Sequence, residues 1–232
     1  MADVPLPDRG RLRHRAERYG TTGGGRALEV VGPLAPGTPL VIAAIHGNET
    51  ESTIALSAAL RTVAAGELRC AAVLATNPDG VLLGTRGNAA GVDLNRNFPT
   101  SDWRSGTVLS HWSSETRQVV ELSTGEAPAS EPETVALMAL IERLRPRWLL
   151  SVHAPIGAII EPEPTPLGEA LVARTGLRRI ARVTYDTPGV LDRWARERGT
   201  PCVTLELPKI THDEAVVTYA VTLAELLRAP IA

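Results

Sequence analysis

Residues 39–51 read PLVIAAIHGNETE, and this stretch decides the fold. Leu40 to Ile45 form an unbroken apolar run with valine and isoleucine in it, which is typical of a strand covered on both faces. The run stops at His46, and a helical pattern follows at once, with one apolar face formed by Leu56, Ala59, Leu60 and Val63. Polar side chains in such a turn lie at the carboxyl end of a buried strand, where open α/β sheets bind their ligands.

Two side chains of this turn suit a metal ion. His46 offers a neutral imidazole nitrogen and Glu49 a carboxylate oxygen, and both are common ligands of Zn²⁺. The alternative is a capped turn that carries a surface histidine. This stretch alone leaves both interpretations open.

Length and composition predict one soluble domain. A chain of 232 residues with 44% apolar content can bury one large core without dividing. The formal charge of −2, without a basic block, argues against nucleic acid and anionic membranes as partners. The amino terminus has no apolar signal region, and no run is long enough to span a membrane. Cys70 and Cys202 lie in apolar runs and are interpreted as buried thiols in a reducing compartment, so we expect a cytoplasmic protein.

Strands and helices are expected to alternate after a polar amino-terminal segment, residues 1–25. The predicted catalytic domain, residues 26–232, has expected strands at 26–31, 40–45, 70–75, 147–152 and 202–207. One helix is expected directly after residue 49, and a second should start from a capping box at 130–133. Two more should end at residues 176 and 198, and the last should begin near residue 213. Residues 77–80 predict a turn and 84–130 a long loop without periodicity. This order predicts an α/β fold with a mostly parallel, mixed sheet and helices on both faces.

Two more polar residues fall at strand positions. His153 ends the apolar strand at 147–152, and Glu206 interrupts the strand at 202–207. A carboxylate in such a strand is costly unless it is paired, near a metal, or at the end of the sheet. Each residue alone could be structural. Together with His46 and Glu49, however, they predict one polar site at the carboxyl ends of the strands.

The polar motifs occur in the order found in zinc metallocarboxypeptidases. They are HGNE at 46–49, GVDLNRNF at 91–98, a single distal His153 and TLEL at 204–207. The resemblance covers residues 20–227 and is strongest to the bacterial murein peptide amidase A branch of the family. The segments that resemble this branch are ASEPET at 129–134, HAPIGAIIEPEPTPLGEAL at 153–171, YDTPGVLDRWARE at 185–197 and PCVTLELP at 201–208.

The resemblance implies a catalytic zinc site. His46, Glu49 and His153 would bind one Zn²⁺ per chain, with water in the open position. Glu206 would act as the general base, and Arg86 would stabilise the oxyanion. For Arg86 the alternative is a solvated arginine in a loop.

The resemblance also implies substrate-binding residues. Asn95 and Arg96 would bind the carboxylate beside the scissile bond, although an Asn-Arg-Asn run is otherwise typical of a polar loop. Tyr185 would be the family's mobile substrate tyrosine, or else a partly buried tyrosine at a strand end. Asp192 and Arg193 fall in the segment that would line the pocket for the far end of the substrate.

The expected reaction is hydrolysis of the γ-D-glutamyl–meso-diaminopimelate bond of murein tripeptide during peptidoglycan recycling. A homodimer is expected from the resemblance alone. One alternative is an N-acyl amino acid deacylase of the aspartoacylase type, but the short segment after Leu207 leaves no room for the β domain of those enzymes. The other is a non-catalytic peptidoglycan-peptide binder, which would have no use for a general base at Glu206.

Overall fold

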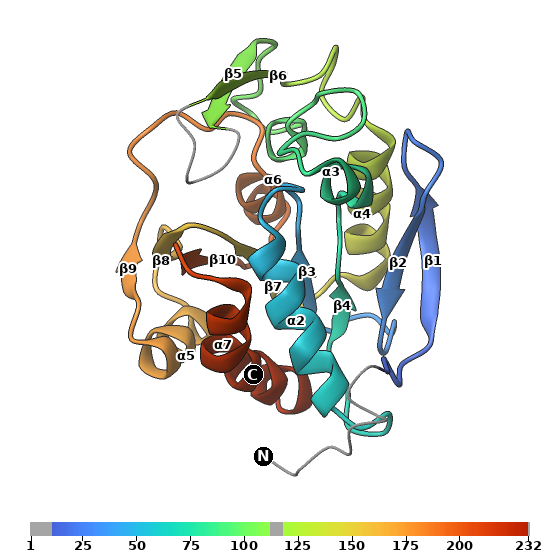
Figure 1. The fold of residues 1–232 in the computed structure, drawn as a ribbon, viewed down its shortest axis with the longest axis vertical. Helices are drawn as coiled ribbons and strands as arrows, with labels where there is room; N and C mark the ends of the chain where they lie inside the picture. The colour runs from blue at the N-terminus through green and yellow to red at the C-terminus, as the bar shows by residue number, and fades with distance from the viewer. Residues whose placement is uncertain (1–10, 112–117, 232) are drawn as a thin grey trace.

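The computed structural model describes residues 11–111 and 118–231, and its centre is an eight-stranded mixed sheet (Figure 1). The strand order is β1-β2-β4-β3-β7-β10-β8-β9. The central strands β4, β3, β7 and β10 run parallel to one another. Strand β2 pairs antiparallel with β1 and β4, and β8 pairs antiparallel with β10 and parallel with β9. The strands are β1 (Ala16–Thr21), β2 (Ala27–Val31), β3 (Leu40–Ala43), β4 (Ala71–Val73), β7 (Leu149–His153), β8 (Ile156–Ile160), β9 (Arg178–Ile180) and β10 (Cys202–Pro208).

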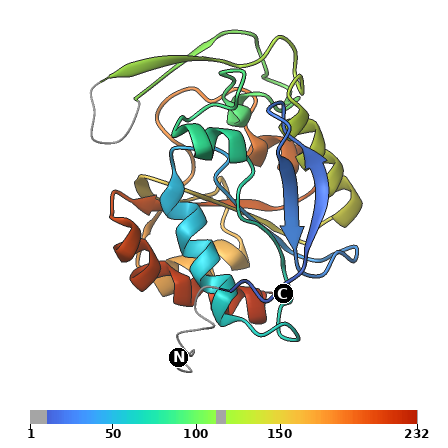
Figure 2. The ribbon, with the colours of Figure 1, turned by 45° about the vertical axis from the view of Figure 1, so that its right-hand side comes forward.

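Helices cover both faces of this sheet, as the sequence predicts. Helices α2 (Thr50–Thr62), α5 (Pro166–Thr175) and α7 (His212–Arg228) pack on one face, where α2 and α7 lie side by side (Figures 1 and 2). Helices α4 (Pro132–Leu144) and α6 (Leu191–Glu197) pack on the other. The side chains of β3 alternate between the two layers, with Val41 in one core and Leu40 and Ile42 in the other. The unbroken apolar run thus reflects a strand buried on both faces.

The predicted strands and helices are found, with ends shifted by a few residues. Both cysteines lie in the sheet region and are buried. The turn at 77–80 opens a short helix, α3 (Pro78–Leu83), because the side chain of Asn77 accepts a hydrogen bond from the backbone N–H of Gly80. Among the described residues, no helix combines the length and the apolar character needed to cross a bilayer.

The long segment at 84–130 is more ordered than its sequence suggests. It holds a 3₁₀ turn, η1 (Leu94–Arg96), and a hairpin of β5 (Thr107–His111) and β6 (Val119–Ser123). The hairpin projects from the end of the molecule opposite to α5 and α7 (Figures 1 and 2). The expected loop is therefore partly wrong.

Two further expectations differ from the structure. Strand β1 lies inside the polar segment 1–25, so the sheet begins earlier than expected. The capping box at 130–133 is wrong, since α4 begins at Pro132 with Glu131 at its N-cap. Glu133 accepts instead from Asn88 and from the backbone N–H of Gly23, so its carboxylate is occupied elsewhere.

Candidate active site

The turn between β3 and α2 brings His46 and Glu49 together. Glu49 is the N-cap residue of α2, and its side chain turns from the helix toward the imidazole of His46. Gly47 allows this turn to pack against α3, because a Cβ atom at this position would lie 2.1 Å from the carbonyl carbon of Gly80. Glycine is therefore required where the two loops touch.

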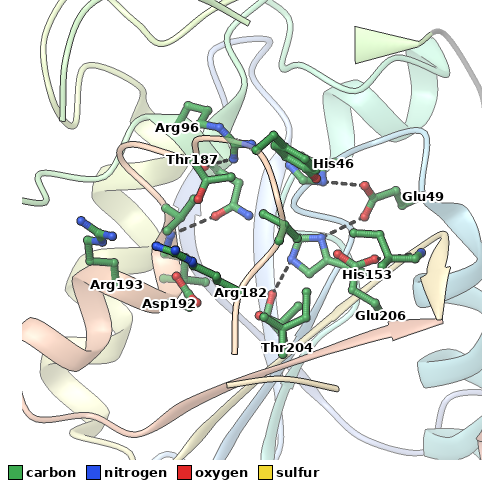
Figure 3. A pocket seen from close by; sticks show the side chains of 18 of the residues that line it. His46, Glu49, Arg96, His153, Arg182, Thr187, Asp192, Arg193, Thr204 and Glu206 are labelled. Atoms are coloured by element: carbon green, nitrogen blue, oxygen red, sulfur yellow. Dashed lines mark hydrogen bonds and ion pairs between the residues drawn. The ribbon is translucent and has the colours of Figure 1, made fainter. Parts of the chain in front are cut away.

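His153 completes a buried cluster with these two residues (Figure 3). Glu49 Oε1 lies 2.6 Å from His46 Nδ1, and Glu49 Oε2 lies 2.9 Å from His153 Nδ1. One donor atom of each residue lies within 4.8 Å of the other two, and all three residues are buried. Two imidazole nitrogens and a carboxylate at this spacing fit a single zinc ion that keeps an open position.

The other nitrogen of each imidazole also has a neighbour. His153 Nε2 lies 2.9 Å from the hydroxyl of Ser151. His46 Nε2 lies 3.2 Å from Asp93 Oδ1, a close charge contact without the alignment of a hydrogen bond. A carboxylate beside Nε2 favours the tautomer that is protonated there, which leaves Nδ1 free to bind a metal.

Asp93 links this cluster to the segments that follow it. Its Oδ2 accepts a hydrogen bond of 2.8 Å from Arg86 Nε, and its Oδ1 accepts one of 2.9 Å from the backbone N–H of Asn95. Arg86 Nη1 also contacts Glu49 at 3.3 Å. Burial opposes ionisation of Asp93, but the charges of Arg86 and His46 outweigh it and hold the pKa of this carboxyl well below its usual range.

Glu206 lies on the strand beside His153. The two residues are register partners in the parallel β10–β7 ladder, and Glu206 Oε2 accepts a long hydrogen bond of 3.5 Å from the backbone N–H of Ile156. Burial raises the pKa of Glu206. Burial also opposes ionisation of Glu49, but the neighbouring His46 and His153 outweigh it and lower the pKa of this carboxyl. The two carboxylates therefore differ: Glu49 is fixed between the histidines, and Glu206 is a separate group beside them.

The 3₁₀ turn η1 places Asn95 and Arg96 next to the cluster. The amide oxygen of Asn95 accepts a hydrogen bond from the backbone N–H of Leu191, which opens α6. The guanidinium of Arg96 is buried and donates through Nη1 to the carbonyl oxygen of Asn95. Tyr185 lies at the rim and is more than half exposed. Every site residue expected from the sequence therefore lies in or around one pocket.

Comparison with known proteins identifies the family of this chain. The family model for zinc carboxypeptidases matches residues 18–162, which include all three candidate ligands. The chain belongs to the zinc carboxypeptidase family. Zinc is the metal that this family name implies for the His46–Glu49–His153 cluster.

Several known proteins are similar to most of the chain. Murein peptide amidase A of Escherichia coli strain K12 is 42% identical over 228 residues, which span 97% of this chain and 94% of that protein. Murein peptide amidase A of Vibrio campbellii is 40% identical over 190 residues, spanning 82% and 77% of the two chains. The crystal structure of murein-tripeptide amidase from Escherichia coli O157 superposes with a TM-score of 0.91 at 40% identity, covering 97% of this chain and 96% of that one. The structure of bovine thrombin-activatable fibrinolysis inhibitor shares the fold, with a TM-score of 0.73 at 18% identity. The superposition covers 93% of this chain and 88% of that one.

The candidate site of this zinc carboxypeptidase family member opens into a cavity of about 890 Å³ (Figure 3). Arg182 and Asp192 lie across the cavity from the histidines, and Arg193 lies farther out. Arg193 Nη1 contacts Asp102 Oδ2 at 2.6 Å. Asp192 Oδ2 accepts a hydrogen bond from Arg196 at 2.9 Å, while its Oδ1 is buried and has no hydrogen-bond partner among the described residues. An orphaned carboxylate oxygen in a cavity wall is a natural contact for a cationic ligand.

Sequence reasoning assigned no role to three of these residues. Asp93 falls within the GVDLNRNF motif, two residues before Asn95, and this position is a signal that could have identified it. Ser151 lies two residues before His153 on the same strand face, so alternation along β7 could have placed it. Arg182 has no such signal, because only the tertiary structure brings residues 181–187 to the cavity.

Proposed function

We propose that this chain is a zinc-dependent amidase that hydrolyses the γ-D-glutamyl–meso-diaminopimelate bond of murein tripeptide. The observation that carries the proposal is the buried His46–Glu49–His153 cluster, with Glu206 on the adjacent strand. The chain that carries this cluster is 42% identical to murein peptide amidase A of Escherichia coli over 97% of its own length.

His46, Glu49 and His153 would hold one zinc ion per chain. When bound, the zinc supplies a lowered pKa for the attacking water and a Lewis acid for the scissile carbonyl. Glu206 accepts the proton of the attacking water and then delivers it to the leaving amine of diaminopimelate. Arg86, held by Asp93 and Glu49, places a fixed positive charge beside the oxygen that becomes negative.

Asn95 and Arg96 would bind the diaminopimelate carboxylate next to the scissile bond. The amide oxygen of Asn95 is engaged by the backbone N–H of Leu191, so its NH₂ group is the part left for the substrate. A guanidinium offers two parallel donors to a carboxylate, which suits Arg96. Tyr185, exposed at the rim, would close over the bound peptide.

One purified sample tests the proposal against its two alternatives. Zinc content is measured, and product release is followed by mass spectrometry with murein tripeptide and with N-acetylaspartate. We expect about one zinc per chain, release of free diaminopimelate from the tripeptide, and no deacylation of N-acetylaspartate. Tripeptide binding without cleavage would indicate the non-catalytic binder, and cleavage of N-acetylaspartate alone would indicate the deacylase.

The metal assignment needs its own variant and control. His153→Ala removes one of three ligands and should lose most of the zinc and the activity. His14→Ala serves as the matched control, because His14 contacts the carbonyl oxygen of Leu60 at the far end of α2. Equal zinc content in both variants and the wild type would remove this site from the proposal.

The proposal includes a role in peptidoglycan recycling in the cytoplasm. Murein tripeptide is a fragment of cell-wall peptide, and the buried thiols of Cys70 and Cys202 suit a reducing compartment. The expected homodimer stays a prediction, which sedimentation of the purified protein checks.

A further inference from the structure

A second cavity, of about 650 Å³, adjoins the first at the candidate metal ligands. Glu49, Arg86 and Tyr185 line both cavities, so the two meet where the scissile bond would lie. Of the two residues assigned to the leaving half of the substrate, Asn95 lines the first cavity only, and Arg96 lies where the two cavities meet. An extended substrate with its carbonyl at the metal site must then direct its acyl half toward the second cavity.

The β5–β6 hairpin forms one wall of this second cavity. The consecutive residues 104–110 all line it. A strand that presented one face would contribute alternate residues only, so β5 presents its edge. The opposite edge of β5 pairs with β6, from Thr107↔Ser123 to His111↔Val119. The projecting hairpin is thus a built wall of the cleft, and Arg104 lies at its base.

Arg104 is the cation on this wall that is available to a ligand. Its guanidinium donates to Asp186, its one side-chain partner among the described residues. Both side chains of this ion pair are more than half exposed, so the pair is weak, and within the described part of the chain the other N–H donors of the guanidinium have no side-chain partner. Arg86 and Arg96 also line the cavity. Arg86 is already engaged by Asp93 and Glu49, and the buried Arg96 donates to the carbonyl oxygen of Asn95 and is assigned to the diaminopimelate carboxylate.

The acyl half of murein tripeptide carries an anion that matches this position. The D-glutamyl residue is linked through its γ-carboxyl group, so its α-carboxylate is free. We infer that Arg104 binds this α-carboxylate and thereby selects γ-linked D-glutamate as the acyl group. Asp186, which contacts the guanidinium, follows Tyr185 in the sequence. The inference rests on the proposed function and adds the group that reads the acyl side.

Two substrates that differ at one group test this assignment. The first is L-Ala-γ-D-Glu-meso-diaminopimelate, and the second carries a carboxamide in place of the glutamyl α-carboxylate. A charge-assisted hydrogen bond in a cleft predicts that the wild type favours the carboxylate substrate about 10- to 100-fold in kcat/KM. Arg104→Met should abolish this preference by slowing the carboxylate substrate alone, and Arg104→Lys should keep part of it. Arg143→Met, which breaks an exposed ion pair with Glu17, is the matched control and should keep the full preference.

The outcomes distinguish failure of this inference from failure of the proposed amidase function. Cleavage of both substrates at equal rates by the wild type overturns the inference and leaves the amidase assignment standing. Equal losses on both substrates in Arg104→Met also overturn it, because Arg104 would then support only the hairpin. If the wild type cleaves neither substrate, the proposed function fails and the inference fails with it.

Discussion

Replacing Asp93 by asparagine tests how the zinc site is held together. The substitution preserves shape but leaves one acceptor oxygen where Asp93 has two. Both oxygens are in use, one by Arg86 Nε at 2.8 Å and the other by the backbone N–H of Asn95 at 2.9 Å. If the amide oxygen stays with Arg86, its NH₂ group faces His46 Nε2, which then becomes an acceptor. The imidazole proton moves to Nδ1, where the metal should bind.

The expected loss follows from these contacts. Removing a group that orients a metal-binding histidine weakens metal binding about 10- to 100-fold, which corresponds to about 1.4–2.7 kcal/mol. Breaking a buried ion pair costs about 3–5 kcal/mol of folding stability. We expect the lower end for Asp93→Asn, about 3 kcal/mol, because Arg86 keeps its contact with Glu49 at 3.3 Å.

Competition with a chelator of known affinity gives the zinc dissociation constant, and calorimetry gives the stability. Asp79→Asn is the matched control, since Asp79 is also buried and paired, with Arg26 Nη1 at 2.7 Å and the backbone N–H of Gly24 at 2.9 Å. It should lose stability but keep its zinc affinity. A dissociation constant for Asp93→Asn within twofold of the wild type would refute the claim that Asp93 sets the tautomer of His46.

Two further predictions concern the chemistry and the leaving half of the substrate. Glu206→Gln should retain zinc and bind tripeptide while kcat falls by about 10²–10⁴-fold, as measured in steady-state assays; loss of zinc instead would make Glu206 a ligand. Murein tripeptide should be cleaved about 10²-fold faster than tetrapeptide, because D-alanine caps the carboxylate assigned to Arg96 and leaves the guanidinium facing a neutral amide, a deficit of about 2–4 kcal/mol. Equal kcat/KM values on the two peptides would contradict the roles of Asn95 and Arg96.

The parts of the fold that the sequence predicts are those with a strong physical signal. Strands buried on both faces, such as β3 and β7, appear as apolar runs, and the polar residues that follow or interrupt such runs mark the site. Strand β1 was not predicted because it is an edge strand whose exposed positions include Glu17 and Arg18, so it has no apolar run. The hairpin lies outside the main sheet, and its exposed positions include Leu109, so it lacks a clear polar and apolar pattern.

The site was predictable only where function imposes a residue type. His46, Glu49, His153 and Glu206 stand out because imidazoles and carboxylates are costly at buried strand ends. The charge of Arg182 carries no such cost on an exposed segment, and its place in the cavity depends on how residues 181–187 cross the end of the sheet. Residues that read a substrate from a cavity wall are therefore the hardest to predict from one sequence.

The far end of diaminopimelate gives the last prediction. It carries an ammonium and a carboxylate, so the cavity should offer one group of each sign. Asp192 has a buried oxygen without a hydrogen-bond partner among the described residues, and this oxygen suits the ammonium. Arg193, expected from the sequence to join it, is engaged by Asp102, whereas Arg182 lines the same cavity as Asp192 (Figure 3). The structure therefore favours Arg182 as the partner for the carboxylate.

Asp192→Ala should slow cleavage of the natural tripeptide about 10- to 100-fold, the effect of one charge-assisted hydrogen bond. An analogue that ends in norleucine lacks both charges and should be affected far less, because it makes no contact that the variant can lose. Asp213→Ala, an exposed change on α7, is the control for both substrates. Losing Asp192 also leaves Arg196 without its 2.9 Å partner, which would disturb the two substrates alike. The ratio of the two kcat/KM values cancels that shared effect, so an unchanged ratio would show that Asp192 supports the cavity wall and does not read the substrate.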